Sequence, residues 1–189
     1  NILDDYYEYD KNIQDQLVRL RDLVITKKDL LQNSEKLREL ERNLTLFHAD
    51  AVNKISLKYK EQIDLIGFHG QTIIHNPQKK ISNQLGDGNL LSQITKKKVV
   101  FDFRQEDILN NGQGAPLTPI FHNLLAKKIN EKNNIQFPII FLNIGGISNV
   151  TKVTNVSEKI QDNLQAFDIG PGNCLIDEWI RNNSSKKID

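Results

Sequence analysis

The stretch Phe167-Asp168-Ile169-Gly170-Pro171-Gly172-Asn173-Cys174-Leu175-Ile176 joins an apolar run to a segment with helical spacing. The apolar run ends at Asp168, a Gly-Pro-Gly turn follows, and a helical pattern begins at Asn173. This pattern predicts a strand, a tight turn and a helix N-terminus, with one carboxylate at the carboxyl end of the strand. Ligands of α/β proteins bind at that edge, and the first N–H groups of a helix can bind an anion. We therefore interpret Asp168 as a candidate catalytic base beside a phosphate.

Composition excludes several classes of protein. The 189 residues carry 25 basic and 24 acidic side chains, a net charge of +1, which gives no electrostatic footprint for nucleic acid. The single cysteine, Cys174, excludes an internal disulfide framework and is typical of a reducing compartment. Neither a membrane-spanning apolar run nor a signal peptide is evident. We therefore expect a soluble cytoplasmic protein that binds neither membranes nor nucleic acid. Because the sequence contains no methionine, we also expect a fragment or a preceding segment.

The first sixty residues contain neither glycine nor proline and place leucines at helical spacing. They predict two amphipathic helices, the second starting near Ser34 and running to about Tyr59. We expect these helices to cover one face of a sheet. The domain prediction is therefore a helical lead-in over 1–60 and an α/β lobe over 61–189.

From residue 63 onward, short apolar runs alternate with helical segments and end in glycine-containing loops. This alternation predicts an α/β sheet. Helices are predicted around 90–94 and over 118–129. Strands are predicted at 64–68, 73–75, 81–85, 98–101, 137–142, 147–153 and 166–167.

Polar clusters follow several of the predicted strands, and parallel strands would bring them to one rim of the sheet. The clusters are His69-Gly70-Gln71-Thr72, Asp102-Phe103-Arg104 with Asp107, Gly112-Gln113-Gly114-Ala115-Pro116, 143–149 and 168–173. Each cluster also has a purely structural interpretation. His69 and Asp168 could be turn residues, Asp102 a helix cap, and Arg104 with Asp107 a surface ion pair. The pair Gly145-Gly146 could form a hairpin turn or approach a phosphate closely.

Taken in order, these motifs resemble one family. The series His69-Gly-Gln-Thr, Gln84-Leu-Gly-Asp87, Asp102-Phe-Arg104, Gly112-Gln-Gly-Ala-Pro-Leu117, Asn143-Ile-Gly-Gly146 with Asn149, and Phe167-Asp-Ile-Gly-Pro-Gly-Asn173 is similar to anhydro-N-acetylmuramic acid kinases. The resemblance runs from about Asp64 to Trp179. It implies a bacterial member of the actin-like, sugar-kinase ATPase superfamily. The expected fold is a ribonuclease H-like lobe with a mixed sheet flanked by helices.

The resemblance also implies a reaction and its site. The family transfers the γ-phosphoryl group of ATP, with Mg²⁺, to O6 of 1,6-anhydro-N-acetylmuramic acid and opens the anhydro ring with water, a step of peptidoglycan recycling. It assigns the general base that activates the water to Asp168. Residues expected near the nucleotide phosphates are Gly145, Gly146, Asn149, Gly170 and Gly172. From motif position and charge, residues expected at the sugar are His69, Asp102, Arg104, Asp107 and Gln113. Arg104 is the natural partner of the lactyl carboxylate.

The sequence departs from the family pattern at both ends. Family members open with a strand and a Gly-Thr-Ser-x-Asp-Gly phosphate loop, and they continue into a second domain. We therefore expect a truncated first lobe that lacks kinase activity by itself, with a homodimer or a companion fragment as partner. Two other functions remain open: a non-catalytic remnant or sugar-binding module, and a hydrolase that uses His69 and Asp168 as an acid–base pair without ATP.

Overall fold

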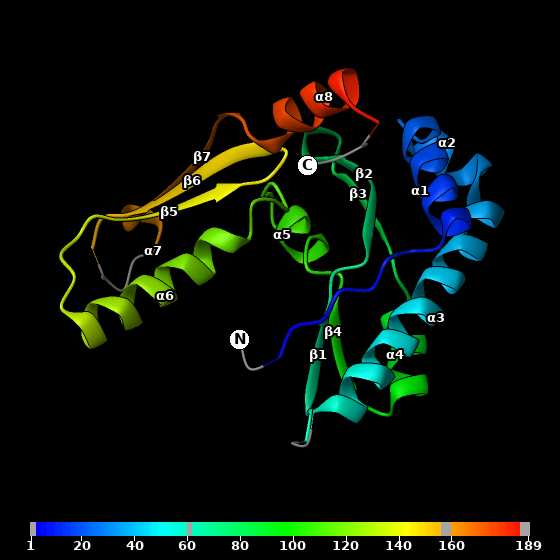
Figure 1. Ribbon diagram of the computed structural model, residues 1–189, viewed down its shortest axis with the longest axis horizontal. Helices are drawn as coiled ribbons and strands as arrows, with labels where there is room; N and C mark the ends of the chain where they lie inside the picture. The colour runs from blue at the N-terminus through cyan, green and yellow to red at the C-terminus, as the bar shows by residue number, and fades with distance from the viewer. Residues whose placement is uncertain (1–2, 60–61, 156–159, 186–189) are drawn as a thin grey trace. The chain divides into compact units, whose positions relative to one another are not determined.

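The structure is a computed structural model that describes residues 3–59, 62–155 and 160–185. The chain divides into two compact units, Asn1–Ala115 and Pro116–Asp189. Both units mix helices with short strands, so the predicted α/β class is confirmed (Figure 1). Within the described residues, the strands form three small sheets rather than one mixed sheet.

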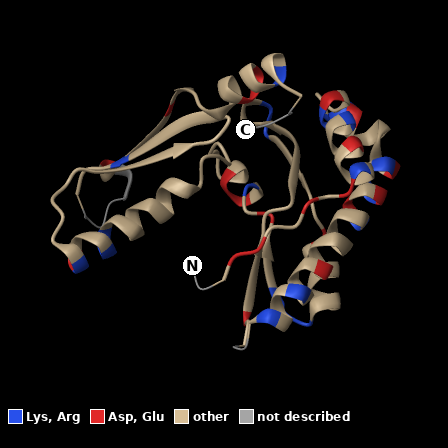
Figure 2. Ribbon diagram, viewed as in Figure 1, with Lys and Arg blue, Asp and Glu red and all other residues tan. Residues whose placement is uncertain are grey.

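The N-terminal unit begins with three helices, α1 (Lys11–Leu23), α2 (Lys27–Gln32) and α3 (Ser34–Lys58). The predicted helix from Ser34 to about Tyr59 is therefore confirmed, but the region before it holds two helices rather than one. The physical reason is a capping box, in which Thr26 and Asp29 satisfy each other's backbone N–H groups and start a new helix. Figure 2 shows acidic and basic residues interspersed along the ribbons of these helices.

Among the residues described after these helices, four strands belong to this unit. The first, β1 (Leu65–Phe68), pairs in parallel with β4 (Lys98–Phe101). A hairpin forms from β2 (Gln71–Asn76) and β3 (Ile81–Leu85), joined by the 3₁₀ turn η1 (Pro77–Lys79). Helix α4 (Gly88–Thr95) precedes β4, and the short helix α5 (Gln105–Leu109) follows it.

The core of the N-terminal unit lies between these helices and strands. Leu40 and Leu44 of α3 and Leu91 of α4 are fully buried, and they belong to one cluster with Phe68 of β1 and Leu85 of β3. Because the helical lead-in shares this core, the contacts divide the chain after Ala115 and not at residue 60. The assignment of 61–189 to a first lobe stays a prediction.

The described residues of the C-terminal unit form one antiparallel sheet and three helices. The described elements are α6 (Thr118–Asn133), β5 (Ile139–Ile144), β6 (Ile147–Val153), α7 (Ile160–Asn163), β7 (Leu164–Pro171) and α8 (Asn173–Asn183). The strand order is β5-β6-β7, and the predicted hairpin of 137–142 with 147–153 is confirmed. Helix α6 covers one face, where the ring of His122 stacks on Phe141 at 4.5 Å. Strand residues on the other face are exposed, namely Ile140, Leu142, Ile144 and Phe167.

Among the described residues, none of the helices has both the length and the apolar character that a bilayer span requires.

Candidate functional site

The carboxyl ends of β1 and β4 lie side by side because these two strands are parallel, with Phe68 opposite Phe101. His69 follows one strand and Asp102 the other, so the two predicted site residues are brought together. Arg104 donates to Nε2 of His69 from Nη2 at 3.2 Å and from Nε at 3.4 Å. The Nδ1 atom of His69 contacts the carbonyl of Gly70 at 3.2 Å. This edge of the small parallel sheet therefore carries a cation held by an imidazole.

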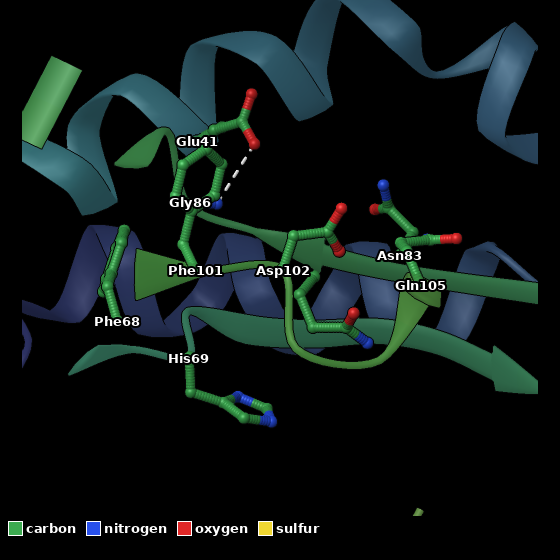
Figure 3. A pocket seen from close by; sticks show the side chains of 9 residues that line it. Glu41, Phe68, His69, Asn83, Gly86, Phe101, Asp102 and Gln105 are labelled. Carbon is green, nitrogen blue, oxygen red and sulfur yellow. Dashed lines mark hydrogen bonds between the residues drawn. The ribbon is translucent and has the colours of Figure 1, made fainter. Parts of the chain in front are cut away.

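A pocket of about 200 Å³ opens at the same edge (Figure 3). It is lined by Glu41, Phe68, His69, Asn83, Gln84, Gly86, Phe101, Asp102 and Gln105. Helix α3 contributes Glu41, which accepts a hydrogen bond from the N–H of Gly86 at 3.0 Å. Burial raises the pKa of the Asp102 carboxyl above its ordinary value. The pocket is therefore a partly desolvated, acidic site.

Two carboxamide oxygens at this pocket are buried and have no hydrogen-bond partner among the described residues. They are Oδ1 of Asn83 and Oε1 of Gln84, both on β3. Sequence reasoning missed Glu41, Asn83 and Gln105 because each lies in an ordinary amphipathic or alternating pattern. Gln84 belongs to the Gln84-Leu-Gly-Asp87 motif, but the spacing of that motif alone assigned the residue no role.

The remaining predicted sugar residues are Asp107, which lies in α5, and Gln113, which lies in the loop after it. Oδ2 of Asp107 accepts a hydrogen bond from the N–H of Gly114 at 2.6 Å, and its carbonyl accepts one from Gly112 at 2.7 Å. A Cβ at Gly112 would lie 2.1 Å from Oδ2 of Asp107, so the glycine allows this tight loop. Among the described residues no ion pair joins Arg104 to Asp107. In this structure the Asp107 carboxylate shapes the loop, and its contact with a sugar stays a prediction.

A second histidine belongs to the same region and was not predicted. His75 of β2 contacts Oγ of Ser82 at 3.0 Å through Nδ1. Burial lowers its pKa most, the positive charge of Arg104 lowers it further, and the backbone of Gln113 acts in the opposite direction. His75 therefore lies within electrostatic reach of Arg104 and within hydrogen-bond reach of the loop that carries Gln113.

In the C-terminal unit, three polar residues form one row across the sheet. Asn143 of β5 lies opposite Asn149 of β6, and Asn149 lies opposite Asp168 of β7. Directly opposite residues on neighbouring strands have Cβ atoms about 5 Å apart. The row is on the face that α6 covers further along, because Thr151, two residues after Asn149, contacts His122 at 2.9 Å.

The prediction that Asp168 ends its strand is wrong. Strand β7 continues to Pro171 because β6 pairs with it as far as Ile147, with one irregularity between Ser148 and Asn149. Asp168 is therefore an exposed residue in the middle of β7. Its place beside Asn149, which was predicted separately, could not be read from the turn that follows it.

The predicted glycines meet where the β5–β6 turn contacts the start of α8. The N–H of Gly172 donates to the carbonyl of Gly146 at 2.9 Å, and the N–H of Asn173 donates to the carbonyl of Gly145 at 2.7 Å. A Cβ at Gly172 would lie 2.1 Å from the Gly145 oxygen. These two N–H groups at the helix start are therefore engaged by the protein in this structure.

No group of three or more His, Cys, Asp or Glu side chains suited to hold a metal ion occurs in the part of the chain that the structure describes. Hard cations such as Mg²⁺ prefer oxygen ligands. They are commonly held by substrate phosphates with only one or two carboxylates of the protein.

Comparison with known proteins places the chain in a class of sugar kinases. A family profile described as anhydro-N-acetylmuramic acid kinase matches residues 1–189. The chain belongs to the anhydro-N-acetylmuramic acid kinase family, and the resemblance drawn from its motifs is confirmed.

Individual relatives agree with the family match. An anhydro-N-acetylmuramic acid kinase from Pelagibacter ubique (strain HTCC1062) is 53% identical over 188 residues, which are 100% of this chain and 48% of the relative. Proteins of the same name from Agrobacterium fabrum and Brucella suis are each 44% identical, over 80% and 86% of this chain and 39% and 42% of the relatives. The chain thus spans about half the length of the curated relatives it matches.

Proposed function

We propose that these residues serve an ATP-dependent kinase that converts 1,6-anhydro-N-acetylmuramic acid into N-acetylmuramic acid 6-phosphate. The observation that carries the proposal is the family match along all of residues 1–189. The reaction belongs to peptidoglycan recycling and amino-sugar metabolism, and a cytoplasmic enzyme would perform it. The finer fold that accompanies this function is a ribonuclease H-like lobe of the actin-like ATPases.

The proposed chemistry assigns the general base to Asp168. Its carboxylate takes a proton from water, the water oxygen forms a bond to the anomeric carbon, and the bond from that carbon to O6 breaks. O6 then bonds to the γ-phosphorus as ADP leaves. ATP with Mg²⁺ supplies the phosphoryl group and neutralises charge that develops on it. The exposure of Asp168 and its neighbour Asn149 support this role, because a water can reach the carboxylate and an amide lies beside it.

The proposed nucleotide contacts are Asn149 with Gly145, Gly146, Gly170 and Gly172. Gly170, at φ 152, has open space where a Cβ would stand, and so does Gly146. Close approach of a phosphate is therefore sterically open at these two glycines. Gly172 supports the site in another way, since it lets the β5–β6 turn contact the start of α8.

The proposed sugar contacts lie in the N-terminal unit. Arg104 is the cation for the lactyl carboxylate, and His69 orients it through the hydrogen bonds to Nε2. Asp102 lines the pocket at the end of β4, and Asp107 shapes the following loop, which carries Gln113, the remaining proposed contact. A second copy of the chain or a companion polypeptide stays the proposed partner.

An assay of the complete product of the gene tests this function. Phosphorus NMR would follow sugar 6-phosphate formation from ATP and 1,6-anhydro-N-acetylmuramic acid. We expect Asp168→Asn to lower kcat by about 10²- to 10⁴-fold, the usual contribution of a general base, while sugar binding persists. The matched control is Cys174→Ala, at an exposed thiol on α8, which should keep full activity.

Three outcomes would contradict the proposal. A fully active Asp168→Asn protein would remove the base assignment. Sugar opening without ATP would favour the hydrolase, and sugar binding without any turnover would favour a binding module. The same assay on residues 1–189 alone tests the expectation that this part lacks kinase activity by itself.

A further inference from the structure

His75 lies on β2 directly opposite Ser82 of β3, within hydrogen-bond reach of the loop of residues 110–116 that follows α5. We propose that His75 is a positioning residue, whose neutral ring holds the 110–116 loop, and with it Gln113, in place for the sugar. The inference rests on the proposed function and adds to it a residue that lies outside the motifs of the sequence.

The two nitrogens of the His75 ring have different partners. Nδ1 lies 3.0 Å from Oγ of Ser82. The backbone of Gln113 also forms a hydrogen bond with the ring, and because that bond raises the pKa of His75, Gln113 accepts it through its carbonyl. Since Ser82 occupies Nδ1, the proton that is donated to Gln113 is on Nε2. The ring therefore joins the β2–β3 hairpin to the 110–116 loop.

The hydrogen bonds of Ser82 set the tautomer of this ring. Its hydroxyl accepts from Nε2 of Gln84 at 2.8 Å, since an amide NH₂ group can only donate. The hydroxyl proton is then directed to Nδ1 of His75, which must be unprotonated to accept it. Ser82 is only 7% exposed, and its carbonyl accepts from Nε2 of Gln105, at the start of α5, at 2.6 Å. These bonds favour a neutral His75 with its proton on Nε2.

Burial and charge favour the same neutral form. Burial lowers the pKa of His75 most, and the positive charge of Arg104 lowers it further. A neutral ring with a proton on Nε2 can donate to the Gln113 carbonyl without placing a second positive charge near the guanidinium. His75 therefore holds the loop without competing with Arg104 for an anionic group.

A second contact joins the same loop to the same hairpin. Nζ of Lys80, directly after the turn η1, donates to Oδ1 of Asn111 at 2.8 Å. Both residues have positive φ angles, 51° and 68°, a conformation that is uncommon outside glycine and persists where the surrounding structure defines it. Because both side chains are exposed and water competes for them, we expect this contact to contribute less than that of His75.

The position of the loop affects Arg104, the proposed cation for the lactyl carboxylate. An added Cβ at Gly114 would lie 3.2 Å from the carbonyl oxygen of Arg104 and 2.7 Å from Cγ1 of Ile108, so the loop packs closely on the start of α5. The N–H of Gly114 donates to Oδ2 of Asp107 at 2.6 Å. A shift of the loop therefore displaces Gln113 and loosens the packing against the backbone of Arg104.

Nitrogen NMR of the complete wild-type protein tests the contact directly. With ¹⁵N-labelled histidines at neutral pH, we expect the His75 resonances, assigned by their loss in His75→Gln, to report a neutral ring with its proton on Nε2. A proton on Nδ1 in this spectrum would overturn the proposal, because Ser82 could then not donate to the ring.

Two conservative variants separate the contacts of the ring. The amide of asparagine reaches the position of Nδ1 and that of glutamine the position of Nε2, so only His75→Gln keeps a donor for Gln113. We expect His75→Asn to raise both the hydrogen exchange rate of the Gly114 amide and the KM for 1,6-anhydro-N-acetylmuramic acid by about two- to ten-fold, the effect of one hydrogen bond. The kcat and the KM for ATP should not change, and His75→Gln should restore both wild-type values.

Two neighbouring lysines supply a matched pair of variants. Lys80→Ala removes the contact with Asn111 and should act in the same direction as His75→Asn, with a smaller effect. Lys79→Ala removes the same charge from an exposed position of the same turn and should keep wild-type values.

Two results with the variants would also overturn the positioning role. A lowered thermal midpoint in His75→Asn, with Gly114 exchange and sugar KM unchanged, would show a purely structural residue. Faster exchange at Gly114 with an unchanged KM would show that the loop does not position the sugar. If wild type forms no sugar phosphate, the proposed function fails instead, and the NMR and exchange measurements still decide the contact of His75 with the loop.

Discussion

The guanidinium of Arg104 donates two hydrogen bonds to Nε2 of His69, a residue 35 positions earlier in the chain. The parallel pairing of β1 with β4 makes this contact, because it brings the ends of both strands to one edge. Burial lowers the pKa of Arg104, yet a guanidinium stays charged at any physiological pH. The edge therefore offers a fixed, oriented cation to an anionic group.

Replacing this cation should separate recognition of the carboxylate from recognition of the sugar ring. We expect Arg104→Gln to weaken binding of 1,6-anhydro-N-acetylmuramic acid by about 10- to 100-fold, because a hydrogen bond to a charged group contributes about 1.5–3 kcal/mol. Binding of 1,6-anhydro-N-acetylglucosamine, which has no carboxylate, should not change. Calorimetry with both sugars measures the difference.

The control for this prediction is Arg38→Gln, at an exposed position of α3. It removes the same charge from the protein without touching the site. Equal losses for both sugars in Arg104→Gln would contradict the lactyl assignment.

The junction between the β5–β6 turn and α8 predicts a difference between two glycines. An added Cβ at Gly172 would lie 2.1 Å from the Gly145 oxygen, whereas one at Gly146 would meet nothing within 4 Å. We expect Gly172→Ala to lower the free energy of unfolding by about 1–3 kcal/mol, through displacement of the turn and loss of its two backbone hydrogen bonds. Gly146→Ala should change it much less.

Chemical denaturation measures the stability of both variants. Hydrogen exchange at the Asn173 amide, which donates to Gly145 in wild type, reports the junction directly. Equal exchange rates in the two variants would show that the close approach does not stabilise the junction.

The partly buried imidazole of His48 predicts a pH dependence of stability. Burial lowers its pKa below the ordinary value, and Nε2 lies 3.0 Å from the hydroxyl of Tyr9. Tyr9 itself accepts from Gln71, so its hydroxyl proton is directed to an unprotonated nitrogen. A group with a lowered pKa contributes stability above its unfolded value of about 6.5, and this contribution is lost as the pH falls.

The measurement compares thermal midpoints at pH values above and below that point. The midpoint of wild type should fall more on acidification than that of His48→Gln, which keeps an acceptor but cannot titrate. His75 and His122, whose pKa values are also lowered by burial, act in the same direction in both proteins. Parallel curves for the two proteins would contradict a role for His48.

Local patterns predicted several elements within a residue or two of their ends. The strands at 81–85, 98–101 and 147–153 have the predicted bounds, because each is a short apolar or alternating run closed by turn residues. The start of α6 at Thr118 was predicted from Pro119 in the first turn. These features depend on neighbouring residues in the chain, so they can be predicted from the sequence alone.

The errors lie where distant segments meet. Asp168 was placed at a strand end because the following Gly-Pro-Gly suggested a turn, but pairing with β6 keeps Gly170 and Pro171 in the strand. The start of the helix at Asn173 was expected to offer N–H groups to an anion, but the carbonyls of Gly146 and Gly145 accept the N–H groups of Gly172 and Asn173. Neither β6 nor the β5–β6 turn can be inferred from the sequence of residues 167–176 alone.

The sequence by itself determined the family, the α/β class and the order of polar motifs, since these depend on residue identity and local periodicity. Only the tertiary structure decided that Asn143, Asn149 and Asp168 form one row, and that Asn83 and Gln84 leave two acceptors unpaired beside Asp102. The physical reason is that strand register and hydrogen-bond satisfaction are properties of packed segments. The sequence pattern of a segment predicts its local structure, whereas the packing of distant segments determines which atoms its residues face.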